Sequence, residues 1–322
     1  MLTLLPKYFG GGWLRDPRVR CIVDDGRNYL WHTHRKYDVI SIEVGQAFRP
    51  GVAAFYTREF YERAKEKLRS GGLLTQFVSL EFFNREELRA VIGTFEDVFS
   101  DCALFHNRTE LLLIGKRDGH IALSPGRVTK LMENVHVRRD MDFSYWGAAD
   151  GRLCEPHVFA ANFLAGSREL KRLGAGARLA DDSVPWLEFS TSSHRTPQIQ
   201  QAKTCLELHL TPVAELFDVD SYPEYDRIEA IRQRNLDNLL SEDYIWQARK
   251  RLDEASADDG ISLLRQALEL NSEHVGARVL LGDALASKGQ YVAASQEWRA
   301  ALALSPGLAL IENRLRASNR MT

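Results

Sequence analysis

The chain has 322 residues, enough for two or three domains, and 44% of them are hydrophobic, which is ample for buried cores. Its 42 lysines and arginines nearly balance its 44 aspartates and glutamates, so the net charge of −2 provides no overall attraction for nucleic acid. Four scattered cysteines without a CxxC pair fit reduced thiols in a cytosolic protein and argue against a cysteine metal cluster.

The chain begins without a signal-peptide pattern, and no stretch approaches the roughly 18 apolar residues that a membrane-spanning helix needs. We therefore expect a cytoplasmic chain, or the soluble part of a longer membrane-attached protein. Three consecutive glycines at positions 10–12 precede the first predicted strand. No apolar strand stands before them, which favours a loop over a glycine-rich cofactor cradle.

Two predicted strands follow, and each of them ends in acidic residues. Residues 18–23 alternate and are rich in β-branched side chains, and they lead into the turn Asp24, Asp25 and Gly26. Residues 37–42 form a nearly continuous apolar run that ends at Glu43. Strands that are apolar on both faces are typical of parallel sheets covered by helices, where ligands bind at the carboxyl ends of the strands. Asp25 and Glu43 are candidate site residues for that reason.

The next segments alternate between helix and strand. Residues 57–68 predict a helix that is stopped by Gly71 and Gly72, and residues 73–80 predict a buried strand. Asn84 and Glu87 form a capping pair for a helix that extends to about residue 99. Residues 103–106 and 110–115 predict an antiparallel hairpin. Residues 1–118 therefore predict an α/β domain whose open sheet has an antiparallel edge.

Residues 119–240 predict helical pieces and loops, and no chemistry can be assigned to them. Asp181 and Asp182 are interpreted as a solvated turn or helix cap in preference to a ligand site. His32 and His34 have the spacing of a metal-binding pair, but no acidic or cysteine partner stands nearby, so we favour an exposed loop. No metal site is expected.

Residues 241–322 predict an all-α region with an internal repeat. Residues 259–271 align with residues 293–305, and Ala267 lies 34 residues before Ala301. A helix–turn–helix period of 34 is typical of tetratricopeptide repeats, which commonly bind peptides. Residues 241–274 would form a degenerate first unit, and residues 308–317 a terminal capping helix. The characteristic positions of the second unit are Leu281, Gly282, Gly289, Tyr291, Ala294, Trp298, Ala301 and Pro306.

The chain resembles the polyamine aminopropyltransferases, the spermidine synthase family. The resemblance is carried by the order and spacing of DPRVRCIVDDGRNYL, YDVISIEVGQAFRPGVAAFYTREFY and the glycine pair that follows. The resemblance covers about residues 7–116, with a weaker echo in LADDSVPWLEF. It implies a Rossmann-like fold of the S-adenosylmethionine-dependent methyltransferase type. It also implies transfer of an aminopropyl group from decarboxylated S-adenosylmethionine to a polyamine such as putrescine.

The resemblance also implies roles for particular residues. Asp25, with Asp24 and Gly26 completing its turn, matches the acidic residue that binds the adenine amine of the donor. Glu43 stands at the position of the catalytic aspartate and is the candidate base. Tyr56 lies where the chain closes over the acceptor and is a candidate substrate-binding residue.

Three departures from the family pattern affect these expectations. Gln46, a candidate substrate-binding residue, replaces a second aspartate, and Glu43 is one methylene longer than the expected aspartate. The family's glycine-rich loop and ribose-binding acid would precede Met1, so we expect an N-terminally incomplete sheet that binds the donor poorly on its own. Two alternatives remain open: a non-catalytic scaffold that binds protein partners through its repeats, and a methyltransferase that uses S-adenosylmethionine on another substrate.

Overall fold

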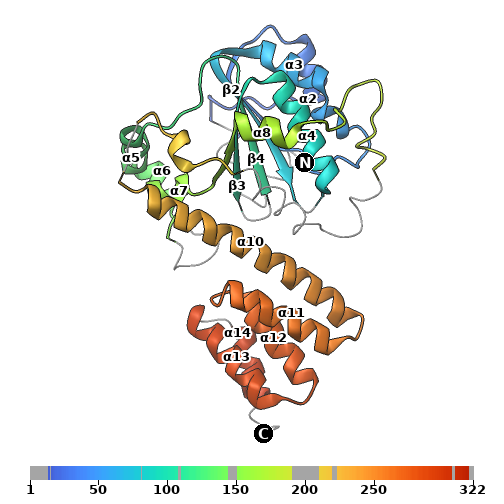
Figure 1. Ribbon diagram of the computed structural model, residues 1–322, viewed down its shortest axis with the longest axis vertical. Helices are drawn as coiled ribbons and strands as arrows, with labels where there is room; N and C mark the ends of the chain where they lie inside the picture. Colours follow the sequence, from blue (N-terminus) through green and yellow to red (C-terminus); the bar gives the residue numbers. More distant parts are fainter. Residues whose placement is uncertain are drawn as a thin grey trace.

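The computed structural model describes residues 14, 16–80, 82–107, 110–143, 151–190, 210–219, 223–306 and 309–318. The predicted glycine loop at residues 10–12 lies outside these ranges. An α/β body and a smaller helical body are joined by one long helix, α10 (Tyr225–Asp253) (Figure 1). None of the helices in the described ranges is long and apolar enough to cross a membrane.

A five-stranded sheet forms the centre of the α/β body, with the strand order β1-β2-β4-β3-β5. β1 runs parallel to β2, whereas the other three neighbouring pairs are antiparallel. The predicted α/β class and the β3–β4 hairpin are confirmed. The strands are β1 (Tyr37–Ile42), β2 (Leu68–Ser79), β3 (Asp101–Asn107), β4 (Glu110–Lys116) and β5 (Phe163–Gly166).

Helices pack against one face of this sheet and against one another (Figure 1). The Thr57 hydroxyl accepts from the Phe60 amide and caps α3, and Asn84 and Glu87 form the predicted capping box of α4. These caps pair amide donors at the start of each helix that no earlier turn can reach. The helices of this layer are α2 (Gly26–His32), α3 (Arg58–Lys67), α4 (Arg85–Val98) and α8 (Ser167–Gly174).

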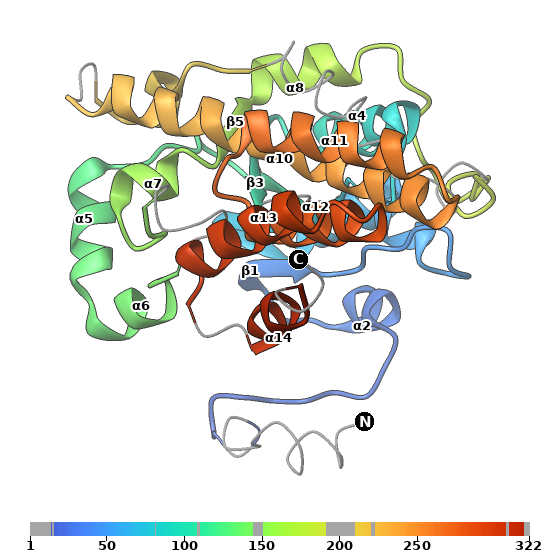
Figure 2. The ribbon, with the colours of Figure 1, turned by 90° about the horizontal axis from the view of Figure 1, so that it is seen from below.

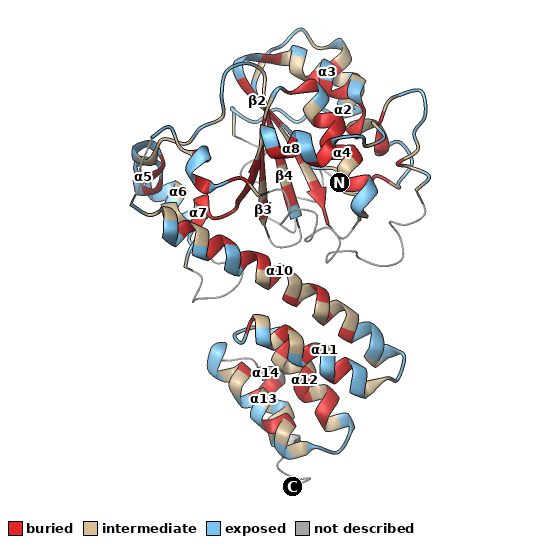
Figure 3. Ribbon diagram, viewed as in Figure 1, coloured by how far each residue is buried: buried red, intermediate tan, exposed pale blue. Residues whose placement is uncertain are grey.

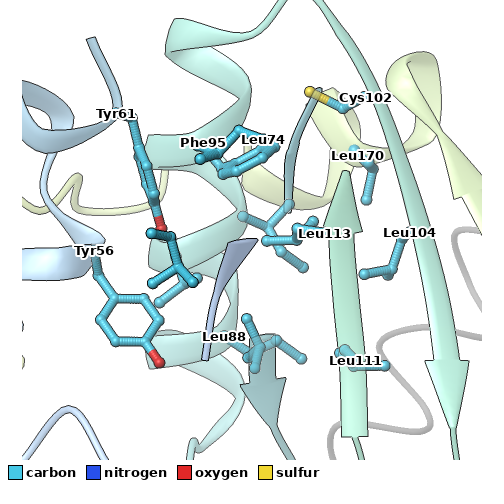
Figure 4. Close-up of a cluster of buried hydrophobic side chains, with 14 of the residues drawn as sticks. Tyr56, Tyr61, Leu74, Leu88, Phe95, Cys102, Leu104, Leu111, Leu113 and Leu170 are labelled. Carbon is cyan, nitrogen blue, oxygen red and sulfur yellow. The ribbon is translucent and has the colours of Figure 1, made fainter. Parts of the chain in front are cut away.

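The main core lies between the sheet and α4, and Figure 4 shows some of its buried side chains. Along β4, Leu111 and Leu113 are buried in this core, while Leu112 and Ile114 are half-buried on the opposite face. This period of two follows from strand geometry. Each fully buried leucine contributes roughly 1.5–3 kcal/mol.

The segment that we expected to be a separate middle region is continuous with the sheet. β5 pairs with β3, and α8 packs on α4, so residues 163–174 belong to the α/β body. A second cluster, which includes Ala103, Val158, Val213 and Ile228, packs beside the β3–β5 pair. The remaining elements of this segment are α5 (Pro125–Glu133), α6 (Val135–Asp140), α7 (Pro156–Ala160) and the 3-10 helix η5 (Val213–Leu216).

The helical body has its own core, and its helices recur with a fixed spacing. α11 (Ala257–Leu270) and α13 (Tyr291–Leu304) begin 34 residues apart, as do α12 (Val275–Ser287) and α14 (Ala309–Ser318). Leu264 and Trp298 occupy equivalent buried positions in this core. Buried and exposed residues alternate along these helices, as Figure 3 shows, so each helix buries one stripe against its neighbours.

Two details of the predicted α/β domain are wrong. Residues 18–23 are not a strand, and Val23 is 87% exposed. No described strand lies next to this stretch, and β-branched side chains alone do not hold a strand without a partner ladder. Figure 2 shows the stretch lying apart from the rest of the body before the chain reaches α2. In addition, α3 has nearly its predicted bounds, from its N-cap Thr57 to its C-cap Leu68, but the glycines do not stop it: Gly71 (φ +71°) lies at an irregularity inside β2.

Candidate functional site

The candidate base, Glu43, directly follows β1 and lies exposed at the carboxyl end of that strand. The Ser41 hydroxyl lies 3.5 Å from Glu43 Oε1, and the Thr75 hydroxyl donates to Ser41 Oγ at 3.0 Å. This chain of hydroxyls from two parallel strands orients the carboxylate from the sheet side. Glu43 is therefore held at the sheet edge and remains accessible to a ligand.

The loop after Glu43 is packed tightly onto the sheet. A Cβ atom added to Gly45 would lie 2.7 Å from Phe77 Cε1, well inside van der Waals contact. Gln46, the other loop residue predicted to bind substrate, accepts from the Arg49 amide through its backbone carbonyl at 2.9 Å, which closes a turn. The loop conformation thus depends on the absence of a side chain at position 45.

Tyr56 contacts this loop from the buried side. It ends the 3-10 helix η2 (Ala53–Tyr56), and its ring is completely buried. Its hydroxyl donates to the Val44 carbonyl oxygen, and it also lies 3.4 Å from the Phe77 carbonyl oxygen. Burial raises the pKa of Tyr56 well above its ordinary value, so the hydroxyl stays protonated as a donor. The side chain predicted to bind substrate thus contacts the loop.

The acidic turn forms the start of α2. Asp25 is its N-cap residue, accepting from the Asn28 amide at 2.9 Å, and Asp24 Oδ1 accepts from the Asp25 amide at 2.8 Å. Both carboxylates are exposed, so they retain oxygen lone pairs for a further partner. Gly26 lies against η2, because a Cβ there would be 3.6 Å from the Phe55 ring. The turn and the loop after Glu43 therefore both adjoin η2.

A cavity of about 380 Å³ opens on the sheet face opposite α4, with Glu43 at its β1 side. Its floor is apolar, and its polar groups come from the carboxylates, amides and imidazole of residues distant in sequence. The residues that line it are Glu43, Phe77, Phe105, His106, Asn107, Glu110, Leu111, Leu112, Ile114, Leu153, Phe159 and Asn162. Such a pocket, apolar with a few polar groups, is the usual form of a small-molecule site.

Most of these lining residues were not foreseen from the sequence. They come from strands and loops as far apart as residues 43 and 162, and no local motif connects them. One signal was present: in the predicted hairpin, Asn107 and Glu110 flank the turn, and alternation places Glu110 on the same face as Leu112. The hairpin pairing alone therefore indicated a sheet face that is apolar along the strands and polar near the turn.

Other candidates from the sequence lie elsewhere. Asp181 accepts from the Ser183 and Val184 amides, and the Ser183 hydroxyl, followed by these amides, lowers the pKa of the Asp181 carboxyl. Asp182 forms an ion pair with Arg27. These contacts support the turn interpretation. Both His32 and His34 are exposed, and no metal-binding group of three or more residues occurs in the described ranges.

The mixed five-stranded α/β sheet, followed by a helical region, is consistent with a methyltransferase-like domain. Residues 3–109 match the spermine/spermidine synthase domain. Three polyamine aminopropyltransferases illustrate the similarity. That of Korarchaeum cryptofilum is 29% identical over 89 residues, covering 28% of this chain and 27% of the relative.

Polyamine aminopropyltransferase 2 of Pseudomonas aeruginosa is 38% identical over 92 residues, or 28% of this chain and 26% of the relative. The enzyme of Salmonella arizonae is 31% identical over 101 residues, or 31% of this chain and 35% of the relative. The chain thus spans about a third or less of the length of the curated relatives it matches. The similarity is confined to the N-terminal third, which contains the acidic turn, β1 and η2.

Proposed function

We propose that the chain transfers an aminopropyl group from decarboxylated S-adenosylmethionine to an amine of a polyamine. The observation that carries this proposal is Glu43, held at the end of β1 and at the mouth of an apolar cavity. The similarity of residues 3–109 to the spermine/spermidine synthase domain supports the same chemistry.

The proposed reaction is a displacement at the donor carbon beside the sulfonium. The attacking nitrogen forms the new C–N bond, the C–S bond breaks, and the electron pair leaves with sulfur as a neutral thioether. Glu43 accepts the proton that the nitrogen loses, and a carboxylate is a suitable base for a nearby ammonium. The Ser41 hydroxyl orients Glu43 for this step.

The donor would lie on the side of the acidic turn. Asp24 and Asp25 are exposed at the start of α2, beside η2, and their free lone pairs suit the adenine amine of the donor. Tyr56 and Gly45 act as positioning residues, because they fix the loop that follows Glu43. Gln46 is proposed to contact the acceptor from this loop, as a neutral group at the position where the family resemblance implies a second aspartate.

The test is the product formed from decarboxylated S-adenosylmethionine and putrescine by the purified chain, measured by mass spectrometry. A product heavier by one aminopropyl group is expected with the wild type and not with Glu43→Gln. Glu133→Gln, an exposed glutamate on α5, is the matched control and should retain activity. Equal product from wild type and Glu43→Gln would remove Glu43 from the mechanism.

Donor affinity is a separate measurement. Calorimetric titration with decarboxylated S-adenosylmethionine should show binding weaker than micromolar, because the turn offers carboxylates for the adenine only. Micromolar binding would contradict this expectation. A methyl addition instead of an aminopropyl addition would identify the alternative, a methyltransferase of another substrate.

The helical body suggests a second candidate function. The 34-residue spacing of α11–α13 and of α12–α14 favours tetratricopeptide repeats, and we propose that this pair serves as a peptide-binding scaffold. If it is the chain's sole function, the wild type and Glu43→Gln will both give no transfer product.

A further inference from the structure

Residues 177–190 form a long segment that contains no helix or strand and lies against the N-terminal third of the chain. In Figure 1 it is the yellow-green loop that leaves α8. Ala180 and Leu187 anchor it in the main core. Irregular segments longer than about 12 residues are uncommon in compact domains and are usually either functional or disordered. The fixed contacts of this segment, which we call the strap, favour a function.

One end of the strap holds the tip of the loop that follows Glu43. Glu188 is half-buried, and its Oε2 accepts from the Gly51 amide at 2.9 Å. Backbone hydrogen bonds close two turns inside this loop, and neither of them uses the Gly51 amide. A carboxylate acceptor makes such a bond stronger than a neutral acceptor does. The loop tip is therefore held by a side chain that comes 137 residues later in the chain.

The other end of the strap reaches the first turn of α2 through Arg27. The Arg27 guanidinium donates to the Ala54 carbonyl oxygen of η2 at 2.8 Å and forms an ion pair with Asp182 of the strap. It also lies over the Trp31 ring, 4.7 Å from the ring centroid. A guanidinium carries several donors in a fixed plane, so one side chain can join separate elements. α2, η2 and the strap therefore meet at Arg27.

The middle of the strap is fixed to α3 and α4 by its backbone. The Arg58 amide donates to the Ala180 carbonyl oxygen at 2.9 Å, and the Asp182 amide donates to Glu59 Oε2 at 3.0 Å. The Ala180 amide donates to Thr94 Oγ1 at 2.9 Å. These bonds give the strap a fixed base from which its side chains hold the loop tip and α2.

We propose that the strap positions the two halves of the candidate site relative to each other. Glu188 holds the loop after Glu43, while Asp182 and Arg27 hold the acidic turn at the start of α2. Arg27 is the shared contact, because it binds both η2 and the strap. Loss of the Glu188 side chain should therefore loosen the loop alone, whereas loss of the Arg27 side chain should loosen both halves. That this order serves aminopropyl transfer rests on the proposed function, whereas the order itself does not.

The first experiment is amide hydrogen exchange of the full chain without any ligand, read by mass spectrometry with fragmentation to single residues. Glu188→Ala should speed exchange of the Gly51 amide about tenfold, because that amide loses a charged acceptor, and should leave residues 24–32 unchanged. Glu188→Gln keeps an oxygen acceptor at the same place and should restore most of the protection. Arg27→Ala should speed exchange in residues 24–32 and in residues 51–56. Glu133→Ala, at an exposed position of α5, is the control and should exchange as the wild type does.

Unchanged exchange at Gly51 in Glu188→Ala, or equal loss of protection in Glu188→Ala and Glu188→Gln, would overturn the inference. Circular dichroism of each variant verifies the fold.

The second experiment measures transfer from decarboxylated S-adenosylmethionine to putrescine. Glu188→Ala should lower kcat about tenfold at an unchanged KM for the donor, and Glu188→Gln should recover most of the rate. Arg27→Ala should also raise the KM for the donor, because it loosens the acidic turn. The two proposals fail separately: faster exchange at Gly51 in Glu188→Ala, with no transfer product from the wild type, refutes the proposed activity alone. Transfer that is unaffected by Glu188→Ala refutes the positioning role alone.

Discussion

Replacing Gly45 by alanine tests how the loop after Glu43 is held. The added Cβ would lie 2.7 Å from Phe77 Cε1, whereas carbon atoms pack best at about 3.5–4.0 Å, so loop and ring must separate by about 1 Å. Overpacking of this kind costs about 1–3 kcal/mol of unfolding free energy. A displacement of about 1 Å near a catalytic group also lowers a rate by roughly 100-fold.

Urea denaturation followed by circular dichroism measures the stability change by linear extrapolation. Gly126→Ala adds the same methyl group in α5, where it would meet nothing within 4 Å beyond its chain neighbours and the nearby backbone of its own helix, and should not destabilise the chain. Phe77→Leu replaces the contacted ring with a smaller side chain, so the double variant Gly45→Ala with Phe77→Leu should lose less stability than the sum of the two single variants. If Gly45→Ala is as stable as the wild type, the loop is not fixed by this contact.

Two other predictions concern the helical body and α10. Gly282→Ala should destabilise the helical body by about 1–3 kcal/mol, because the new Cβ would lie 2.4 Å from Trp298 Nε1, and tryptophan fluorescence during denaturation reports the change. Burial raises the pKa of Asp243, despite its hydrogen bond from Gln247. The protonated carboxyl therefore contributes to the free energy of unfolding below the ordinary aspartate pKa of about 3.9, and this contribution decreases as the pH rises to the raised pKa. Asp243→Asn should remove that decrease in pH-dependent thermal denaturation, and an unchanged profile would contradict the assignment.

Local rules were sufficient for much of the α/β body. The capping pair of Asn84 and Glu87, the β3–β4 hairpin and the apolar run at residues 37–42 were all predicted from short stretches of sequence. For the capping pair and the hairpin the decisive interactions are between residues close together in the chain, whereas the apolar run was recognised from its composition alone, because its partner is the later strand β2. The position of Glu43 at a strand end followed from the same local pattern.

Features that depend on distant partners were not predicted. Residues 18–23 have strand-forming side chains, but no neighbouring strand in the described ranges pairs with them. The cavity joins β1, the β3–β4 hairpin and α7, and its lining shares no sequence motif. Tyr56 was expected to face a ligand, yet its hydroxyl faces the Val44 carbonyl, a contact that only the folded loop reveals.

Helix α10 was also missed, and its sequence explains why. It has 29 residues, but its buried side chains do not follow one stripe: Ile228 and Ile231 pack in the α/β body, whereas Ile245 and Ala248 pack in the helical body. Between them lie the buried polar residues Asn235 and Asn238. A helix that changes its buried face along its length gives no single hydrophobic period.

Because α10 contributes side chains to two cores, the two bodies share one cooperative element. Helix formation is cooperative along the chain, so loss of packing at either end also weakens the turns on which the other core depends. Amide hydrogen exchange at the centre of the helix, around Leu239, should then be slowest, since those amides open only when both bodies unfold. A substitution in one body would thereby change how readily the other body unfolds, even where the substituted residue makes no contact with that other body.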